Sequence, residues 1–204
     1  MSEKVIVTGF EPFGGEKENP TRIIAENING KNIAGKEIEG ILLPVSVKRT
    51  AEALLKILQE KKPDILILTG LNGRINDINL ERVAINVIDA RIPDNDGVKP
   101  VDQIIVEHGE NAYFSTLPIR EIMNKLHENK IPASISNSAG TYLCNYSMYL
   151  ALNYAKQNGY PKKSGFIHVP FLYDQVLDRA QFSGMSKEHL IDSIDISVKT
   201  AIEF

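Results

Sequence analysis

The chain has 204 residues with 23 basic and 26 acidic side chains, which give a formal net charge of −3 at pH 7. Hydrophobic residues make up 43% of the chain, enough for a complete core, so the length favours one α/β domain over residues 1–204. The charges are interleaved without a basic stripe, which argues against a nucleic acid as partner. A single cysteine excludes an internal disulfide and leaves no cysteine spacing for a metal site.

The N-terminal apolar run, residues 5–7, is too short for the core of a signal peptide. No other apolar run approaches the length of a membrane span. We therefore expect a soluble, cytoplasmic protein that stays in a reducing compartment and does not bind membranes.

Predicted strands and helices alternate along the whole chain. Short apolar runs predict strands at 4–8, 38–45, 64–69, 131–135 and 165–169. Capping residues and apolar stripes predict helices after Asn19-Pro20, after Ser46, from Pro118, from Asn145 and after Ser186. Residues 80–90 read as a strand or a hairpin arm, and residues 171–185 show no clean period. The alternation predicts the α/β class, with an open, mostly parallel, twisted sheet and helices on both faces.

Ligands of such sheets bind beyond the carboxyl ends of the strands. Four chemically interesting places fall at these ends: the glycine loop 9–15, the segment 70–81, Cys144 and His168. We therefore expect them to lie at one edge of the sheet.

Cys144 is predicted at or just before the start of a helix, after the small-residue turn 136–141. Free N–H groups and the positive end of the helix dipole favour a thiolate there, and the thiolate is the nucleophilic form. A lone cysteine is as commonly a small buried apolar residue, so its position alone leaves both roles open.

A cysteine hydrolase also needs a base and a group that orients the base. Of the four histidines, His168 is the one predicted at a strand end beside Cys144, although a lone histidine in a strand is more commonly a core residue. His108, His127 and His189 are predicted in loops or on polar helix faces. The carboxylates Glu81, Asp89, Asp94 and Asp96 remain open as the orienting acid, and Glu81 could equally form a surface ion pair with Arg82.

The glycine loop 9–15 has the spacing of a phosphate-binding loop but lacks the Lys-Ser/Thr of a Walker A motif, and Glu16 would repel phosphate. Phe10 and Phe13 in this loop suit either core packing or an aromatic pocket. A phosphate-dependent transferase and a binding module without catalysis are the alternatives that the residues leave.

Three separated stretches resemble the pyroglutamyl peptidase I (pyrrolidone-carboxylate peptidase) family of cysteine peptidases. The first is Thr8-Gly-Phe-Glu-Pro-Phe-Gly-Gly15 with Asn19-Pro20. The second runs from Gly70-Leu-Asn-Gly-Arg to Leu80-Glu-Arg-Val-Ala-Ile-Asn86. The third comprises Ser138-Ala-Gly-Thr-Tyr-Leu-Cys-Asn145 and Phe166-Ile-His-Val-Pro170. The resemblance spans nearly the whole chain in the family's order.

The resemblance implies that Cys144 is the nucleophile, His168 the base and Glu81 the orienting acid of an enzyme that removes N-terminal pyroglutamate from peptides. It implies a substrate pocket that contains Phe10, Phe13, Asn19, Leu71, Arg91, Ile92 and Tyr142. It also implies that no cofactor or metal takes part, and that the chain forms a homo-oligomer, a homotetramer. Residues 171–185 contain too many apolar side chains for a free surface loop, so we expect another copy of the chain to cover them in part; these side chains are Phe171, Leu172, Val176, Leu177, Phe182 and Met185. Two departures from the family pattern are Asn79 and the pair Leu71-Asn72.

Overall fold

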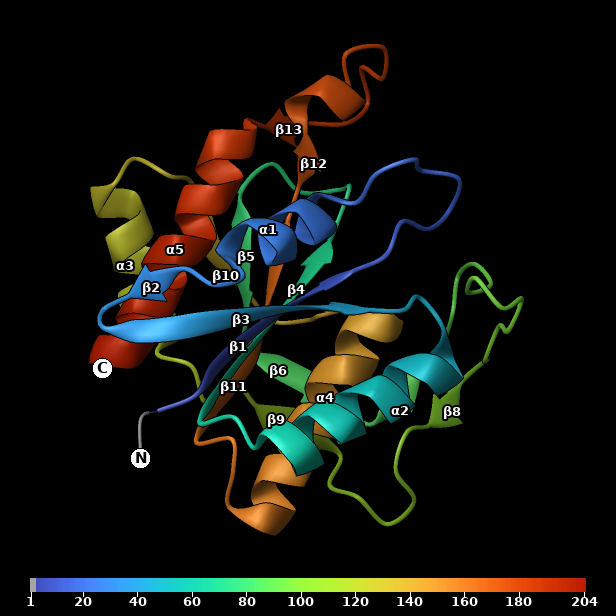
Figure 1. Cartoon of the computed structure of the whole chain (residues 1–204). Helices are drawn as coiled ribbons and strands as arrows, with labels where there is room; N and C mark the ends of the chain where they lie inside the picture. The colour runs from blue at the N-terminus through green and yellow to red at the C-terminus, as the bar shows by residue number, and fades with distance from the viewer. Residues whose placement is uncertain (1–2) are drawn as a thin grey trace.

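A seven-stranded sheet forms the centre of the computed structural model, which describes residues 3–204 (Figure 1). Its strand order is β10-β5-β11-β4-β1-β3-β2. The strands are β1 (Val5–Phe10), β2 (Asn32–Ile33), β3 (Lys36–Leu43), β4 (Ile65–Leu71), β5 (Ile78–Glu81), β10 (Ala133–Ser136) and β11 (Lys163–Val169). The late strand β11 therefore lies between β4 and β5, which are consecutive along the chain.

The sheet is mostly parallel, as predicted, because β3, β1, β4 and β11 all run the same way. The other strands depart from this direction. β5 pairs antiparallel with β11, β10 follows the direction of β5, and β2 pairs antiparallel with β3. The reversal of β5 has a local cause: residues 72–77 are too few for a parallel crossover, which needs a dozen or more residues.

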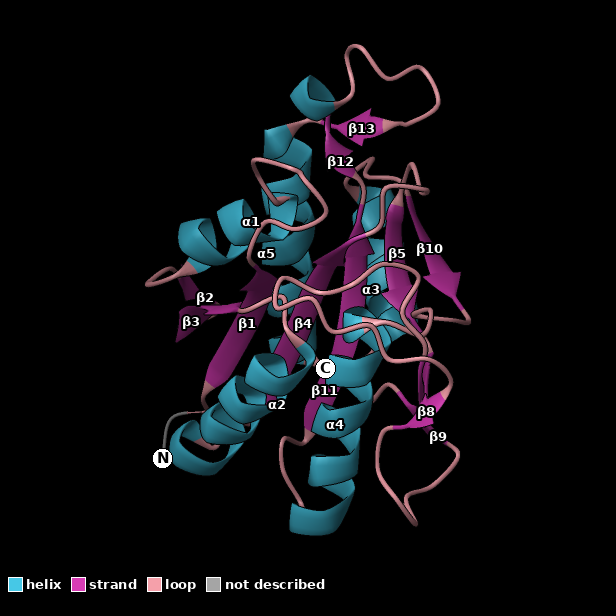
Figure 2. Cartoon of the chain, turned by 90° about the vertical axis from the view of Figure 1, so that its right-hand side faces the viewer, coloured by secondary structure: helices cyan, strands magenta, loops and turns pink. Residues whose placement is uncertain are grey.

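Five α-helices cover both faces of the sheet, as predicted (Figures 1 and 2). They are α1 (Pro20–Ile28), α2 (Val47–Lys56), α3 (Ile119–Glu128), α4 (Leu143–Asn158) and α5 (Lys187–Glu203), with a π-helical turn (Ile57–Lys61) after α2. Helices α1, α3 and α5 pack with Val5 and Val7 in one core, and α2 and α4 pack with Ile6 in the other. Within residues 3–204, no helix has the length and apolar character needed to cross a membrane.

The three predicted side-chain caps are confirmed. Asn19 accepts a hydrogen bond from the Thr21 amide, Ser46 from the Arg49 amide and Ser186 from the His189 amide. Each cap satisfies an amide at the start of a helix that would otherwise lack a partner. These caps fix where α1, α2 and α5 begin.

Three short two-stranded ladders complete the fold. The first two involve residues 80–90, which the sequence left open between a strand and a hairpin arm. The three ladders are β6 (Val83–Ile85) with β9 (Ala112–Phe114), β7 (Val87–Ile88) with β8 (Gln103–Ile104), and β12 (Phe171–Leu172) with β13 (Gly184–Met185). Residues 171–185, here called the arm, extend from one end of the molecule in both views and contain a 3₁₀ turn (Tyr173–Gln175) (Figures 1 and 2).

Most apolar residues of the arm are buried by the chain itself. Phe171, Leu172, Val176 and Met185 are all less than a tenth exposed without any partner. Leu177 is 64% exposed and Tyr173 is 61% exposed. Packing within one chain therefore buries four residues that were expected to be covered by another copy. The two exposed side chains, Leu177 and Tyr173, remain available for a contact with another copy.

Candidate active site

His168 and Glu81 form a buried hydrogen-bonded pair. Glu81 is the last residue of β5 and His168 lies near the end of β11, so the antiparallel pairing of these strands brings them together. Glu81 Oε1 lies 2.7 Å from His168 Nδ1, and the two residues are 1% and 4% exposed. Arg82 instead donates to Asn137 Oδ1 over 2.8 Å. The alternative of a surface pair between Glu81 and Arg82 is therefore wrong.

Cys144 is the second residue of α4, which confirms its predicted place at a helix start. Its half-buried thiol lies above Gly70 of β4. A Cβ atom on Gly70 would lie 2.9 Å from the sulfur and 2.6 Å from Cζ of Phe166. Only glycine at this position leaves room for both the thiol and the aromatic ring beneath it.

Cys144 and Glu81 together control the charge of His168. Burial alone would lower the pKa of the imidazole, but the charge and hydrogen bond of Cys144, together with those of Glu81, outweigh it and raise the pKa of His168 to about 10. Because Nδ1 faces Glu81, Nε2 is the ring nitrogen left to exchange a proton with Cys144, which lines the same cleft as His168. The imidazole is therefore bonded to a carboxylate and shares a cleft with a thiol, an arrangement that suits proton transfer at the sulfur.

The start of α4 is held by Asn145, which is fully buried. Its Oδ1 accepts from the Ile85 amide, and its Nδ2 donates to the carbonyls of Ile85 and Val87, each over 2.9 Å. Thr141 adds a bond from Oγ1 to the Asp89 carbonyl over 2.9 Å. The sequence did not indicate this role for Asn145; the available signal was an amide side chain directly after the cysteine.

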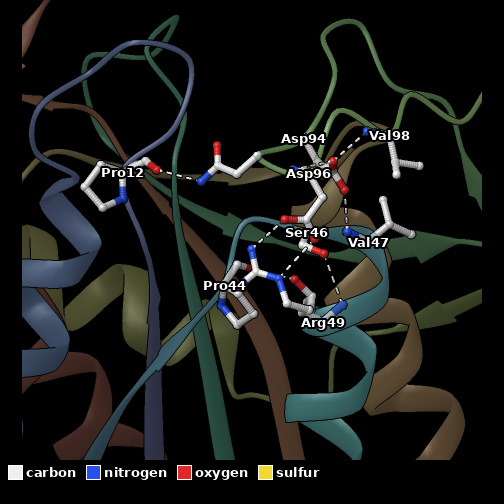
Figure 3. A network of polar contacts seen from close by, with 10 residues as sticks. Pro12, Pro44, Ser46, Val47, Arg49, Asp94, Asp96 and Val98 are labelled. Atoms are coloured by element: carbon white, nitrogen blue, oxygen red, sulfur yellow. Dashed lines mark hydrogen bonds and ion pairs between the residues drawn. The ribbon is translucent and has the colours of Figure 1, made fainter.

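Asp94 and Asp96 have other partners: Asp94 holds backbone amides and Asp96 holds a guanidinium (Figure 3). Asp94 is 6% exposed and accepts from the amides of Val47, Asp96 and Val98. Asp96 pairs with the Arg49 guanidinium, with Nη2–Oδ1 at 2.9 Å. None of these bonds involves His168, so neither carboxylate acts as its hydrogen-bond partner.

Two further contacts complete this picture. Asp89 accepts only a long bond of 3.4 Å, from the Asp102 amide. Asn95 donates from Nδ2 to the Pro12 carbonyl over 3.0 Å, which ties the glycine loop to the turn after Asp94 (Figure 3). The loop is thus fixed on one side by residues far away in the sequence.

The glycine loop has a packing role that needs no phosphate. Gly9 lies within β1, and a Cβ atom there would lie 2.0 Å from the Thr21 carbonyl oxygen. The glycine therefore allows close contact between β1 and α1. Glu16 is already paired with Arg179 over 2.6 Å. Both observations argue against a phosphate-binding loop.

Two connected cavities surround Cys144. The inner pocket is lined by Phe10, Phe13, Asn19, Val45, Leu71, Tyr142, Leu143 and Cys144. The outer cleft has a volume of about 680 Å³ and shares Phe13, Leu71, Tyr142 and Cys144 with the inner pocket. Arg91, Ile92 and His168 line the outer cleft alone. All seven residues expected in a substrate pocket thus line one cavity or the other, and Glu81 lies behind His168.

Polar groups are scarce in the inner pocket. The Asn19 side chain is largely occupied, because Oδ1 accepts from the amide and hydroxyl of Thr21 and Nδ2 donates to the Glu11 carbonyl. The buried Tyr142 hydroxyl has no hydrogen-bond partner among residues 3–204. Burial, followed by the nearby charges of Asp94 and Cys144, raises the pKa of Tyr142 to about 12. Tyr142 therefore keeps its proton and offers a free donor beside the thiol.

The two departures from the family pattern are accommodated locally. Asn79 donates to Asp77 Oδ1 over 2.7 Å and to Ser134 Oγ over 3.0 Å, which joins β5 to β10 two residues before Glu81. The Asn72 side chain accepts from the Arg74 amide over 3.1 Å and closes a turn after β4. Leu71 adds an apolar side chain to both cavities.

A sequence model described as Pyroglutamyl peptidase matches residues 3–204. The chain belongs to the pyroglutamyl peptidase family. Among its curated relatives, the pyrrolidone-carboxylate peptidase of Pyrococcus furiosus is 50% identical over 98% of both chains. The pyrrolidone-carboxylate peptidase of Thermococcus litoralis is 48% identical over 99% of this chain and 94% of the relative.

Solved structures of the pyroglutamyl peptidase family have the same fold. A mutant pyrrolidone carboxyl peptidase from P. furiosus superposes with a TM-score of 0.96 at 50% identity, covering 98% of both chains. The pyrrolidone carboxyl peptidase from T. litoralis gives a TM-score of 0.97 at 47% identity over 99% of this chain and 94% of that one. Within residues 3–204 of this family member, no group of three or more His, Cys, Asp or Glu is placed to hold a metal ion.

Proposed function

We propose that the protein hydrolyses the bond after an N-terminal pyroglutamyl residue of peptides, with Cys144 as nucleophile, His168 as base and Glu81 as the acid that orients His168. The observation that carries this proposal is a histidine bonded to a buried carboxylate, in one cleft with a thiol at a helix start and beside a largely apolar pocket. Membership of the family supports the substrate class.

Each step of the reaction needs one proton movement at His168. The Cys144 sulfur attacks the pyroglutamyl carbonyl carbon while His168 holds the thiol proton. The tetrahedral intermediate collapses when His168 gives that proton to the leaving nitrogen, and a thioester remains on Cys144. Water then attacks the thioester with His168 as base, which releases pyroglutamate and restores the thiol.

The start of α4 suits the negative oxygen of the tetrahedral intermediate. Tyr142 at the N-cap makes no side-chain cap, so amides of the first turn are available to an acceptor near Cys144. One donor of this kind typically contributes on the order of 10²–10³ in rate.

The walls of the inner pocket suit the flat, neutral lactam ring, and because the pocket has a volume of only about 20 Å³ in the free protein, its lining side chains must move apart to admit the ring. The faces of Phe10 and Phe13 cover its carbon atoms, and the Tyr142 hydroxyl can donate to the lactam carbonyl. A substrate that lacked this carbonyl would leave the hydroxyl unpaired in the complex, at a cost of about 1–3 kcal/mol. The pocket therefore discriminates between pyroglutamyl and prolyl peptides.

Hydrolysis of a pyroglutamyl-amide reporter beside its prolyl analogue tests this function. The wild-type protein should release the amine only from the pyroglutamyl compound. Cys144→Ala and Cys144→Ser should fold with unchanged circular dichroism and lose nearly all activity. Near-native turnover by purified Cys144→Ala, or equal turnover of both reporters by wild type, would end this proposal.

We also propose that the protein is cytoplasmic and forms a homotetramer, with the exposed Tyr173 and Leu177 of the arm at a contact between copies. Large apolar side chains exposed together are typical of such contacts. Light scattering at micromolar concentration tests the assembly: a tetramer is expected, and a monomer would contradict it.

A further inference from the structure

The arm is fastened at two points to residues 16–18, which directly follow the glycine loop. Arg179 forms a two-pronged ion pair with Glu16, with Nη1–Oε1 at 2.6 Å and Nη2–Oε2 at 2.9 Å. Gln175 donates from Nε2 to the Glu18 carbonyl over 3.0 Å. The hydrogen bond from Arg179 lowers the pKa of Glu16, in keeping with a charged pair. A bidentate ion pair fixes the relative orientation of the two side chains as well as their distance. This contact therefore sets the position of the arm.

Phe171 lies at the base of the arm and is packed on three sides. The Arg179 guanidinium carbon lies 5.4 Å from its ring centroid, and the Phe182 ring meets it edge-on at 5.4 Å and 66°. Gly73 in the turn after β4 supports the ring directly, since a Cβ there would lie 2.3 Å from Cε2 of Phe171. Phe171 is consequently only 7% exposed.

These aromatic residues do not fill either hydrophobic core. The two cores on the faces of the sheet contain neither Phe171 nor Phe182. Both rings and Arg179 instead line the outer cleft, which also contains Cys144 and His168. Phe182 is half-buried, so part of its ring faces the open space of the cleft.

The chemistry of the proposed reaction places the leaving peptide on the same side. His168 gives its proton to the leaving nitrogen, so the first residue of the leaving peptide must lie beside His168. The arm begins three positions after His168 and lines the outer cleft, whereas the inner pocket proposed for the pyroglutamyl ring contains no residue of the arm. The side chain of that first leaving residue therefore faces the wall that Phe182 and Phe171 form.

We propose that Phe182, supported by Phe171, is the subsite for the first residue of the leaving peptide and favours an aromatic or large apolar side chain. The Glu16–Arg179 pair positions this wall. Because Glu16 neutralises Arg179, the wall carries no net charge and suits an uncharged side chain. The inference rests on the proposed pyroglutamyl peptidase function.

The test uses the full chain and two substrates, pyroglutamyl-phenylalanine amide and pyroglutamyl-glycine amide. The two substrates differ only in the side chain after the pyroglutamyl residue. The ratio of their kcat/KM values therefore measures the contribution of that side chain. Wild type should prefer the phenylalanine compound by about tenfold, the size expected for one aromatic contact with partial burial. Phe182→Ala should bring the ratio close to one, and Phe182→Leu should give an intermediate ratio and serves if the alanine variant does not fold.

Charge reversal tests the role of the ion pair. Glu16→Arg and Arg179→Glu should each lower the ratio, and the double reversal should restore much of it. Lys31→Met is the matched control, because Lys31 forms a similarly exposed pair with Asp195, at 2.7 Å, outside the residues that line the cleft. It should leave the ratio unchanged.

The outcomes separate the two proposals. If wild type hydrolyses neither compound, the proposed function fails. If it hydrolyses both with a ratio that Phe182→Ala and the single reversals leave unchanged, only the subsite is refuted. An equal fall in both rates would also refute it, because the wall would then support the whole site and not the leaving residue.

Discussion

Glu81→Gln separates the charge of the orienting acid from its shape. The glutamine keeps the size of the side chain at a position that is 1% exposed. If its oxygen faces His168 Nδ1, the ring keeps its orientation but loses the neighbouring negative charge. If its amide nitrogen faces Nδ1 instead, the ring proton must move to Nε2. The Nε2 atom then carries a hydrogen and can no longer accept the proton of Cys144.

The expected loss is a factor of about 10–10³ in kcat/KM, equal to roughly 1.4–4 kcal/mol. In a serine triad the corresponding change costs ~10⁴ in kcat. The loss should be smaller here because a cysteine ionises more readily than a serine and depends less on the strength of the base.

The pH profile gives a second readout of the same variant. Glu81 is one of the two groups that raise the pKa of His168 to about 10, against an ordinary value near 6.5. The imidazolium contributes stability below the unfolded pKa, and this contribution is lost as the pH rises through the folded pKa. In Glu81→Gln the alkaline loss of stability should therefore move to lower pH, as should the alkaline limb of kcat/KM.

Steady-state kinetics from pH 5 to about 10.5, together with melting temperatures over the same range, measure both effects. Arg82→Ala is the control, because Arg82 bonds Asn137 and not Glu81, and it should keep wild-type kcat/KM. Wild-type turnover and an unshifted alkaline limb in Glu81→Gln would refute the role of this carboxylate.

Three further substitutions test the walls of the site. Phe13→Ala should raise KM for pyroglutamyl substrates more than it lowers stability; a loss of about 3–5 kcal/mol in stability with little change in KM would make Phe13 a core residue instead. Tyr142→Phe should raise KM while the melting temperature stays level or rises, because the variant removes a buried hydroxyl that has no partner in the free protein. A lower melting temperature with unchanged KM would contradict the hydrogen bond to the lactam. Gly70→Ala should remove most of kcat, because the added methyl group would lie 2.9 Å from the Cys144 sulfur. Wild-type kcat in a correctly folded Gly70→Ala would contradict this packing.

The strands and helices that could be predicted are those with strong local signals. The run 64–69 is apolar from residue 65 to residue 68 and corresponds to β4, and Asn19-Pro20 carries its own cap and start signal for α1. The reversal of β5 depends on the short link 72–77 and on a partner, β11, that comes more than 80 residues later. The two-residue and three-residue ladders have too few positions to show a period.

The candidate site divides in the same way. Strand and helix ends were enough to place Cys144 and His168 at one edge of the sheet. The residue pattern alone did not identify Glu81 among the carboxylates, because their partners depend on the tertiary fold. Glu81 bonds His168, whereas Asp94 bonds backbone amides and Asp96 bonds Arg49. The family resemblance supplied that choice, and the geometry agrees with it.

The pairing between the arm and the segment after the glycine loop could not be predicted from the sequence. Glu16 and Arg179 are separated by 163 positions, and each looks like an ordinary surface charge. Only the folded chain brings them together over an aromatic ring.

The position of β11 between β4 and β5 has a consequence for biosynthesis. These two strands leave the ribosome early, yet the strand that joins them begins at residue 163. Until it arrives, the nascent chain exposes two unpaired strand edges, which are prone to pair with other chains. The same insertion delivers His168 to Glu81 and Cys144. We therefore expect the growing chain to lack peptidase activity until translation is nearly complete, because the activity requires β11 to be in place between β4 and β5.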